Sequence, residues 1–248
     1  MCMKESFHKN NKNLINKMGF DKSLWSLTKK WILKAHNYEY NYHFSWLGRP
    51  IIQFPQDIIA FQEIIWKTKP DLVIETGIAR GGSLVFLSSM LELNKHGTVL
   101  GIDNSLRSHN EISIKKHSMH KRIKIMKGSS VEPKIIQSVF DIARNKKKII
   151  LILDSDHSTE HVLKELMAYS PLILKGCYIV VCDTILEDFP KNWLQDHGIN
   201  RPWNKENNPK TAVYEFLKVN NRFMIDKDFQ NKLLITTAPD GYLKCIKD

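Results

Sequence analysis

Four acidic residues each stand at the end of an apolar run, and this pattern points to a ligand site. The residues are Glu75, Asp103, Asp154 and Asp183. Because ligands of open α/β sheets bind at the carboxyl ends of the strands, which meet at one edge, we expect the four carboxylates to converge there. A single aspartate at a strand end is often only a helix N-cap, but four at one edge indicate a binding or catalytic site.

The first of these acids opens a glycine-rich turn that leads into a predicted helix. The turn reads Glu75-Thr-Gly77-Ile-Ala79-Arg-Gly81-Gly82-Ser83, and its small residues let a ligand approach the backbone closely. A dinucleotide would place its pyrophosphate on the helix N-terminus, with Asp103 on the ribose hydroxyls. Glu75 would repel a pyrophosphate but suits an ammonium group, so S-adenosylmethionine is favoured over a nicotinamide cofactor. The predicted cofactor-binding residues are Glu75, Gly77, Ala79, Gly81, Ser83, Asp103 and Ser129.

A second group of residues combines carboxylates with histidines. Asp154 and Asp183 end adjacent predicted strands, which suits two oxygen ligands of a hard divalent cation. His157 and His161 share one face at the start of a helix. They could instead join an aspartate in a two-histidine, one-carboxylate iron site, although the oxygenases that use this triad mostly have all-β folds. A third interpretation gives both histidines structural roles only, His157 as a cap and His161 in packing.

Alternating strands and helices must position these residues. Strands are predicted at 71–75, 98–103, 122–126, 149–154 and 177–183, and helices at 57–69, 83–93, 133–144 and 159–169. Strands that are apolar throughout and alternate with helices indicate an α/β fold with a mostly parallel sheet covered on both faces. The C-terminal part adds a predicted helix at 212–219 and strands near 222–225, 232–236 and 242–246. The turn Pro239-Asp-Gly241 should join the last two strands in an antiparallel hairpin.

Residues 1–56 are predicted to form a basic helical extension and an aromatic loop, ahead of a ligand-binding domain at 57–248. Residues 1–34 hold eight lysines against two acids, about half of the net charge of +11, and their apolar residues have helical spacing. We expect a frayed basic start and an amphipathic helix, either packed on the domain or held against an anionic surface such as acidic lipid or glycan. Residues 38–55 are dense in aromatic residues, which predicts a loop.

The composition argues against several other classes of protein. The 248 residues, 42% hydrophobic and 25% charged, are typical of one globular domain with or without an extension. Residues 1–19 lack the apolar core of an export signal and no run is long enough to span a membrane, so a cytoplasmic protein with at most peripheral membrane contact is expected. The four cysteines include no C-x-x-C pair, which disfavours disulfides and zinc ribbons. The basic clusters at 115–127 and 144–148 lack stacking aromatic residues, so nucleic acid is not an expected partner.

With these residues, the sequence resembles the cephalosporin-hydroxylase family of methyltransferases, whose name is historical and whose relatives include rhamnosyl and macrolide-sugar O-methyltransferases. The resemblance spans about residues 42–243 and rests on Trp46-Leu-Gly-Arg-Pro50, Gln53-Phe-Pro-Gln-Asp57, Pro70-Asp-Leu-Val-Ile-Glu-Thr-Gly77, Gly81-Gly-Ser83, Leu153-Asp-Ser-Asp-His157, Asp183-Thr184, Asn208-Pro209 and Ala212-Val213. It implies a Rossmann-like class I methyltransferase fold that uses S-adenosylmethionine and Mg2+.

The resemblance also implies a metal site, in which one ligand differs. Asp154 matches a metal ligand and the pair Cys182-Asp183 matches an acidic pair, but the family usually has Glu at position 182. Cysteine is a poor Mg2+ ligand, so Thr184, Glu187 or Asp188 would have to replace the missing carboxylate. We expect Asp154, Asp183 and Thr184 to hold the metal.

The predicted activity is O-methylation of a hydroxyl of a sugar, glycan or glycosylated metabolite. A sugar hydroxyl is a weak nucleophile, and a bound divalent cation lowers its pKa and fixes its oxygen near the methyl group. His157 would then accept the proton, with Asp154 as the second catalytic residue. The expected partner is a small-molecule or glycan acceptor, and a homo-oligomer is compatible with the sequence. The alternative is a non-catalytic protein that binds S-adenosylmethionine or a polyanion, in which Cys182 records the loss of the metal site.

Overall fold

A seven-stranded sheet forms the centre of the protein in the computed structural model, which describes residues 3–198 and 201–248. The strands are β3 (Leu72–Thr76), β4 (Thr98–Asp103), β5 (Ile123–Lys127), β6 (Ile149–Leu153), β7 (Tyr178–Val181), β8 (Phe223–Ile225) and β9 (Tyr242–Cys245). Their order is β5-β4-β3-β6-β7-β9-β8. The first five strands in that order are parallel, whereas β9 is antiparallel to both of its neighbours.

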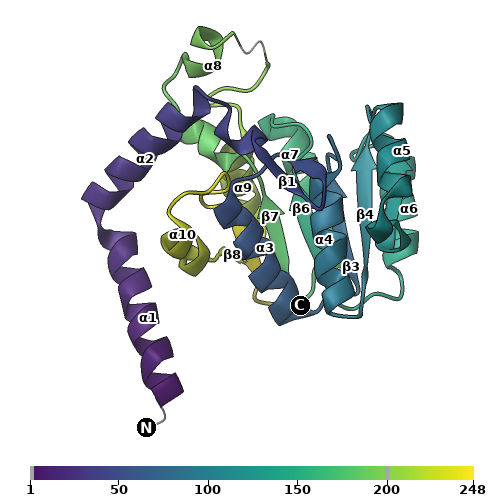
Figure 1. Ribbon diagram of the computed structural model, residues 1–248, viewed down its shortest axis with the longest axis horizontal. Coiled ribbons are helices and arrows are strands. Elements are labelled where there is room, and N and C mark those ends of the chain that lie inside the picture. The colour runs from purple at the N-terminus through teal and green to yellow at the C-terminus, as the bar shows by residue number, and fades with distance from the viewer. Residues whose placement is uncertain (1–2, 199–200) are drawn as a thin grey trace.

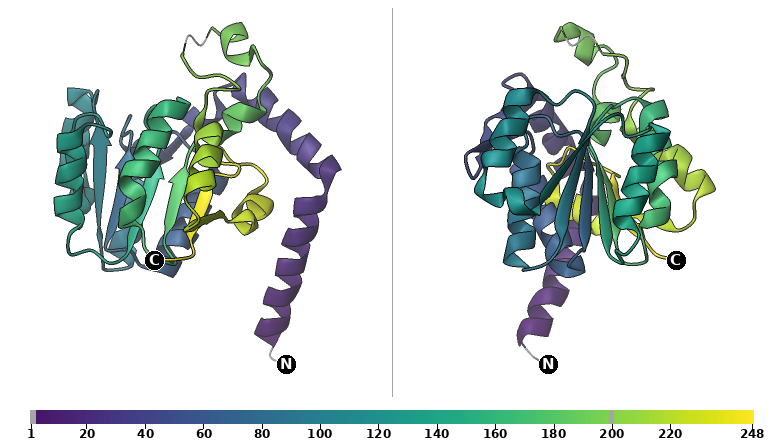
Figure 2. Two further views of the ribbon diagram at one scale, coloured as in Figure 1. Left: turned by 180° about the vertical axis from the view of Figure 1, so that it is seen from behind. Right: turned by 90° about the vertical axis from the view of Figure 1, so that its right-hand side faces the viewer.

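Helices cover both faces of this sheet (Figure 2). One layer contains α3 (Pro55–Thr68), α4 (Gly82–Leu93) and α5 (Ser108–Lys116), and the other contains α6 (Pro133–Ala143), α7 (Thr159–Tyr169) and α9 (Pro209–Val219). Every residue of β3, β6 and β7 is buried, because each strand packs against both layers. The predicted α/β fold with a mostly parallel sheet is therefore confirmed.

Prolines and an asparagine determine where three of the helices begin. Pro55, Pro133 and Pro209 stand in the first turns of α3, α6 and α9, where a missing N–H costs nothing and the fixed φ suits a helix. Asn208 caps α9, because its side-chain oxygen accepts hydrogen bonds from the N–H groups of Lys210 and Thr211.

The aromatic segment at 38–55 is more ordered than the predicted loop. After a single 3-10 turn at Tyr40–Tyr42, it forms an antiparallel hairpin of β1 (Phe44–Trp46) and β2 (Arg49–Ile51). The two-residue connection, Leu47-Gly48, has positive φ at both positions, as this hairpin type requires. Leucine rarely adopts such a φ, so a two-residue turn at this position is not expected from the residue types. The Trp46 ring packs edge-on against Phe86 of α4, which fixes the hairpin on the domain.

The C-terminal antiparallel pair is present, but its predicted members were partly wrong. β9 pairs with β8, and residues 232–236 form no strand, because α10 (Lys227–Leu233) occupies part of that segment. The hydrogen bonds of the following residues go to a buried carboxylate instead of a strand. The Thr236 hydroxyl and the Thr237 N–H both donate to Asp57 of α3, which also accepts from the Tyr242 hydroxyl at 2.7 Å.

An N-terminal arm, residues 3–36, extends from the sheet as two helices (Figure 1). The arm comprises α1 (Met3–Phe20) and α2 (Lys22–His36), and α1 lies beside α10. Asp21 caps α2 by accepting from two backbone N–H groups, each at 2.9 Å. Ile32 of α2 packs into an apolar cluster with Phe54 and with Trp193 of α8 (Trp193–Asp196). Within the described ranges, no helix combines the length and apolar character needed to cross a bilayer.

Asp57 provides a test of how the C-terminal segment is held. Asp57→Ala leaves the Thr236 hydroxyl, the Thr237 N–H and the Tyr242 hydroxyl without their buried acceptor, so we expect the free energy of unfolding to fall by about 3 kcal/mol or more. Urea denaturation followed by circular dichroism measures this change. Exposed Asp141→Ala is the control and should shift stability by no more than about 0.5 kcal/mol. Equal midpoints for Asp57→Ala and the parent would contradict this role of Asp57.

Candidate active site

The structure places the four strand-end acids at one edge of the sheet, as their positions in the sequence predict. Asp103, Glu75, Asp154 and Asp183 stand at or just beyond the ends of β4, β3, β6 and β7, which are neighbours in that order. All four strands are parallel, so their carboxyl ends lie side by side.

Two of these acids enclose a histidine. His157 Nε2 lies 3.2 Å from Asp183 Oδ2 and 3.6 Å from Asp154 Oδ1. Each of the three side chains has one possible metal-ligand atom, and these three atoms all lie within 4.8 Å of one another. In the described part of the chain, this is the cluster of His, Cys, Asp or Glu side chains that could hold a metal ion. Predicted residues from the ends of two strands and from the loop after β6 therefore meet at one point.

The charges in this group favour a bound cation. Burial raises the pKa of Asp154 to about 6. The contact with His157 lowers this pKa and the carboxylate of Asp183 raises it further, but both effects are smaller than that of burial. Burial alone would lower the pKa of His157, but Asp183 and Asp154 outweigh it and raise that pKa to about 9. Two carboxylates in one partly buried place require a positive charge, which a protonated His157 provides here. The carboxylate oxygens are the donors that Mg2+ prefers, so the residues present fit this metal.

Other side chains complete the surroundings of the carboxylates. The Gln53 amide donates to Asp154 Oδ2 at 3.2 Å, while its own Oε1 is buried and has no partner among the described residues. The Trp203 ring lies against His157, with 5.0 Å between ring centroids. Burial, and next the Asp183 carboxylate, raise the pKa of the Tyr42 phenol. Residue-by-residue reasoning missed Gln53 and Trp203; the only sequence signal was the motif Gln53-Phe-Pro-Gln-Asp57.

The three residues expected to replace the missing ligand at position 182 all have other partners. The Thr184 hydroxyl donates to the Pro239 carbonyl at 2.6 Å and is fully buried. Glu187 accepts a hydrogen bond from the asparagine that caps α9, and Asp188 pairs with two lysines. The Thr184 hydroxyl is thus directed to a backbone carbonyl, and the third side chain beside the two aspartates is His157.

Cys182 lies in the apolar core. Its side chain is 2% exposed and belongs to the cluster between the sheet and the layer of α3 and α4. Burial raises the pKa of the thiol well above its ordinary value, and the thiol is not part of the group of ligand atoms formed by Asp154, His157 and Asp183.

His161 points to a separate polar cluster. Its Nε2 lies 3.1 Å from the Ser130 hydroxyl and 3.5 Å from the buried Glu165 carboxylate. It is absent from the metal-ligand group formed by His157 and the two aspartates. Among the described residues, the two-histidine iron site therefore does not form.

The predicted cofactor turn has the backbone that its sequence suggests. Gly77, Ala79 and Gly81 all have positive φ, of 85°, 47° and 81°. The Asp103 carboxylate accepts hydrogen bonds from the N–H groups of Ile78 and Ala79, at 2.9 and 3.3 Å, and so holds the turn against β4. Ser129 lies in the turn after β5, at the same edge of the sheet, where its carbonyl accepts from the Glu132 N–H.

Gly77 is required by a backbone contact. A Cβ at this position would lie 2.0 Å from the carbonyl oxygen of Asp154. Because Gly77 has no side chain, the glycine-rich turn packs directly against the backbone of Asp154, in the loop that follows β6. The space that a Cβ would fill is therefore occupied by the protein's own backbone.

Glu75 is fully enclosed at the base of the turn. Its Oε2 accepts a hydrogen bond from the Ser83 hydroxyl at 2.9 Å. Burial, and then the carboxylate of Asp154, raise the pKa of Glu75 well above its ordinary value, against the lowering effect of Ser83. A positively charged ligand group nearby would stabilise the ionised form.

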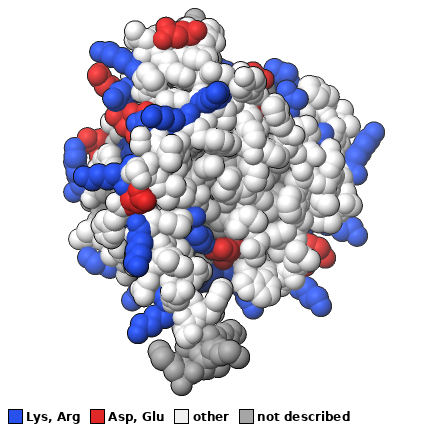
Figure 3. Space-filling model, turned by 60° about the vertical axis from the view of Figure 1, so that its left-hand side comes forward, with Lys and Arg blue, Asp and Glu red and all other residues white. Residues whose placement is uncertain are grey.

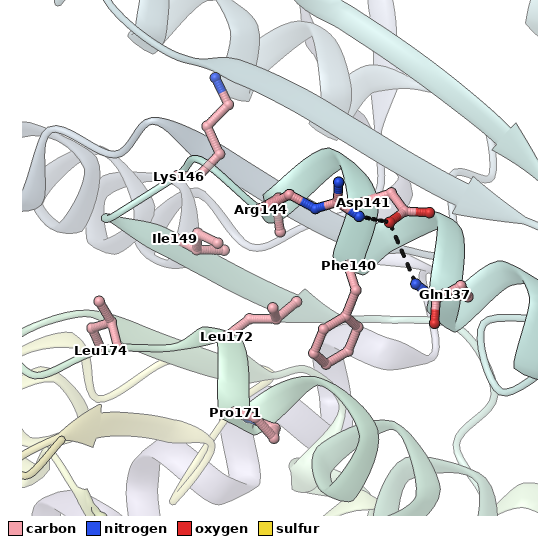
Figure 4. Close-up of a pocket in the computed structure, with 10 residues that line it drawn as sticks. Gln137, Phe140, Asp141, Arg144, Lys146, Ile149, Pro171, Leu172 and Leu174 are labelled. Atoms are coloured by element: carbon pink, nitrogen blue, oxygen red, sulfur yellow. Dashed lines mark hydrogen bonds and ion pairs between the residues drawn. The ribbon is translucent and has the colours of Figure 1, made fainter.

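The hollow shown in Figure 4 is separate from this site. It has a volume of about 400 Å³ and lies between α6 and the segment after α7, near the amino end of β6. Arg144, which lines it, is paired with Asp141 at 2.7 Å. The carboxylate group is at the opposite edge of the sheet.

Comparison with known proteins identifies the family. Residues 38–246 match the family described as Rhamnosyl O-methyltransferase/CmcI. The chain belongs to this family. A rhamnosyl O-methyltransferase of Mycobacterium tuberculosis (strain H37Rv) is 30% identical over 190 residues, covering 75% of this chain and 72% of the relative. One from Mycobacterium leprae is 32% identical over 148 residues, covering 59% and 62%. These findings confirm the resemblance and the predicted O-methyltransferase class.

Solved structures confirm the fold. The apo structure of CmcI has a TM-score of 0.57 and 16% identity, covering 84% of this chain and 78% of CmcI. A CmcI structure titled with Mg and S-adenosylmethionine has a TM-score of 0.55 and 17% identity, covering 83% and 77%. At this level of identity the similarity shows the Rossmann-like methyltransferase fold.

Position 182 offers a test of the site's boundary. Cys182→Ala should keep the activity and lower the free energy of unfolding by about 1 kcal/mol, since the thiol only packs. Buried Cys177→Ala is the matched control. Cys182→Glu should be destabilised by about 3 kcal/mol or more, because it buries a carboxylate close to Asp57, Glu75 and Asp154. A methyl-transfer assay measures the activity of Cys182→Ala, and thermal denaturation with and without Mg2+ measures the stability of both variants. If Mg2+ stabilised Cys182→Glu more than the parent, residue 182 would reach the metal.

Proposed function

We propose that the protein is an S-adenosylmethionine-dependent, Mg2+-assisted O-methyltransferase that acts on a hydroxyl of a sugar or a glycosylated molecule. The observation that carries this proposal is the pair of carboxylates, Asp154 and Asp183, that enclose His157 beside the glycine-rich turn. The family assignment and the names of the curated relatives support the reaction and the rhamnosyl class of acceptor.

Asp154 and Asp183 would hold the metal through one carboxylate oxygen each. Gln53 fixes the Asp154 carboxylate by donating to its second oxygen, so that Oδ1 faces His157 and Asp183. When bound, Mg2+ would lower the pKa of the acceptor hydroxyl, and S-adenosylmethionine would supply the electrophilic methyl group.

His157 is the proposed proton acceptor. A cation held by the two carboxylates would lower the pKa of His157, so that its neutral Nε2 could accept the proton of the sugar hydroxyl. The hydroxyl oxygen would then bond to the methyl carbon as the bond from that carbon to the sulfonium sulfur breaks, which releases S-adenosylhomocysteine. Asp154 and Asp183 lie within 3.6 Å of Nε2 and stabilise the imidazolium that results. The Trp203 ring beside His157 offers an apolar surface on which a sugar ring can rest.

The turn after β3 is the proposed cofactor site. Glu75 at its base would face the ammonium group, and Ser83 would keep the Glu75 carboxylate in place. Asp103 Oδ2 holds the turn, so a ribose hydroxyl would donate to Oδ1 and replace the long contact from the Ser105 hydroxyl, which lies 3.3 Å away. Gly77, Ala79, Gly81 and Ser129 complete the set as positions where the backbone lies close to the ligand.

The direct test is turnover. The protein, incubated with methyl-labelled S-adenosylmethionine, Mg2+ and a panel of rhamnosides and other glycosides, should transfer label to a sugar hydroxyl. Binding of S-adenosylmethionine without transfer to any acceptor of the panel would favour the non-catalytic alternative.

The metal role predicts a specific loss. Asp183→Asn removes one carboxylate from the pair, so we expect Mg2+ affinity and activity to fall about 100-fold. Excess EDTA should abolish activity of the parent, and Mg2+ should restore it. Exposed Asp196→Asn is the charge-matched control and should behave as the parent. Full turnover in EDTA would rule out the metal and leave His157 as an unaided base.

The glycine contact predicts a coupled loss of cofactor binding. Gly77→Ala combines a strained φ with a Cβ that would lie 2.0 Å from the Asp154 carbonyl, so the turn and the metal loop must move apart. Gly176→Ala has nearly the same φ, +89°, but nothing within 4 Å of its Cβ, and therefore controls for backbone strain alone. Isothermal titration should show S-adenosylmethionine binding lost in Gly77→Ala and kept in Gly176→Ala. Equal affinities in the two variants would show that the contact does not shape the cofactor site.

A further inference from the structure

The N-terminal arm exposes large apolar side chains to solvent. Phe20 is 87% exposed and Leu27 is 63% exposed, and Phe7, Leu14 and Trp31 are exposed as well. On α2, Leu27 and Trp31 lie one turn apart, on a face next to the one that carries the buried Thr28 and Ile32. The Trp31 ring still contacts Tyr40 and Phe54, with ring centroids 5.1 and 6.3 Å apart, whereas Phe20 and Leu27 keep most of their surface in solvent.

Lysines accompany this apolar face. Lys30 and Lys34 are exposed and fall on the same side of α2 as Leu27, by the helical repeat. Among the described residues of the arm, Lys29 makes the one ion pair, with Asp188 at 3.5 Å. Figure 3, in which this side of the molecule comes forward, shows more blue than red side chains around a broad uncharged surface.

The arm also contains helix that the domain does not support. Every residue from 6 to 14 of α1 is exposed, and this stretch is rich in lysine and asparagine. An isolated helix of this length is marginal in water, so a surface that accepts its apolar residues would stabilise it.

The charge balance selects the partner. Residues 1–34 carry eight lysines and two acids, a net +6 of the chain's +11, so the remainder of the chain is also positive, at +5. A second copy of the protein would therefore meet the arm with like charge. A nucleic acid would satisfy the lysines but leave Phe20 and Leu27 without an apolar environment. An anionic bilayer surface satisfies both, since its headgroups are negative and its acyl boundary is apolar.

We propose that the N-terminal arm docks the protein on an anionic lipid bilayer. The arm lies along the surface, with its lysines among the headgroups and its exposed Phe and Leu side chains at the acyl boundary. This docking does not depend on the proposed methyl transfer, and no step of the reaction involves the arm.

Vesicle co-sedimentation with the full chain tests the proposal. The parent should bind vesicles of mixed phosphatidylcholine and phosphatidylglycerol, more weakly as salt rises, and should not bind pure phosphatidylcholine. The triple variant Lys22→Gln, Lys30→Gln, Lys34→Gln should lower partitioning by about 100-fold at low salt. The double variant Phe20→Ser, Leu27→Ser should lower it at least about tenfold.

Matched controls remove equal charge and equal apolar surface elsewhere. Lys116, Lys121 and Lys124 are exposed and lie far from the arm in the sequence, so their change to Gln should leave binding near that of the parent. The double variant Ile112→Ser, Val219→Ser removes exposed apolar residues outside the arm and should also bind like the parent, which controls for Phe20→Ser, Leu27→Ser. Circular dichroism of each variant checks that the domain remains folded.

Three results would overturn the proposal. Arm variants that bind vesicles as well as the parent would remove the arm from the interface. Binding that requires the lysines but not Phe20 and Leu27 would indicate a general polyanion surface. Absence of vesicle binding, together with self-association that the arm variants abolish, would assign the arm to a second copy of the chain.

Discussion

The contact between Gly77 and the backbone of Asp154 is the constraint on which the rest of the site depends. β3 and β6 are neighbours in the sheet, and the loops that follow them meet where a single methyl group would not fit. This contact joins the glycine-rich turn to the loop that carries Asp154 and His157. The two halves of the proposed site, for cofactor and for metal, are therefore parts of one rigid arrangement, and a change in one must displace the other.

Positive charge is the second requirement of this edge of the sheet. Glu75, Asp154 and Asp183 lie close enough that Asp154 raises the pKa of Glu75 and Asp183 raises that of Asp154, after the larger effect of burial in each. Among the described residues, His157 is the basic group that pairs with Asp154 and Asp183. An ammonium group beside Glu75 and a divalent cation between the aspartates would complete the balance, which is why this geometry suits a cationic cofactor together with a metal better than a pyrophosphate.

The sequence predicted those parts of the fold that depend on local pattern. The strands at 98–103 and 149–154 and the helix at 159–169 agree with the structure within a residue, because apolar runs and helical repeats are read directly from neighbouring residues. The segment at 232–236 has equally strand-like residues, but its hydrogen bonds are taken by Asp57, which is distant in sequence. Neighbouring residues in the sequence do not show that a distant side chain will take the hydrogen bonds a strand would otherwise form.

The same distinction applies to the site. Asp154 and Asp183 could be predicted because the ends of parallel strands meet at one edge of the sheet. Gln53 contacts Asp154, and Trp203 contacts His157, from loops whose paths depend on the whole fold. Thr184 was expected at the metal because it follows Asp183 in the chain. The direction of a hydroxyl is not set by sequence position, and that of Thr184 is bonded to the Pro239 carbonyl.

The alternation of side chains along β7 explains why cysteine is accommodated at position 182. Tyr178 and Val180 pack toward α3 and α4, and Cys182 continues this series into the same apolar cluster. At Asp183 the backbone leaves the strand with φ of 54°, and its side chain reaches His157 at the edge of the sheet. Residue 182 thus belongs to the core and residue 183 to the site, so a small apolar side chain at 182 leaves the pair of Asp154 and Asp183 intact.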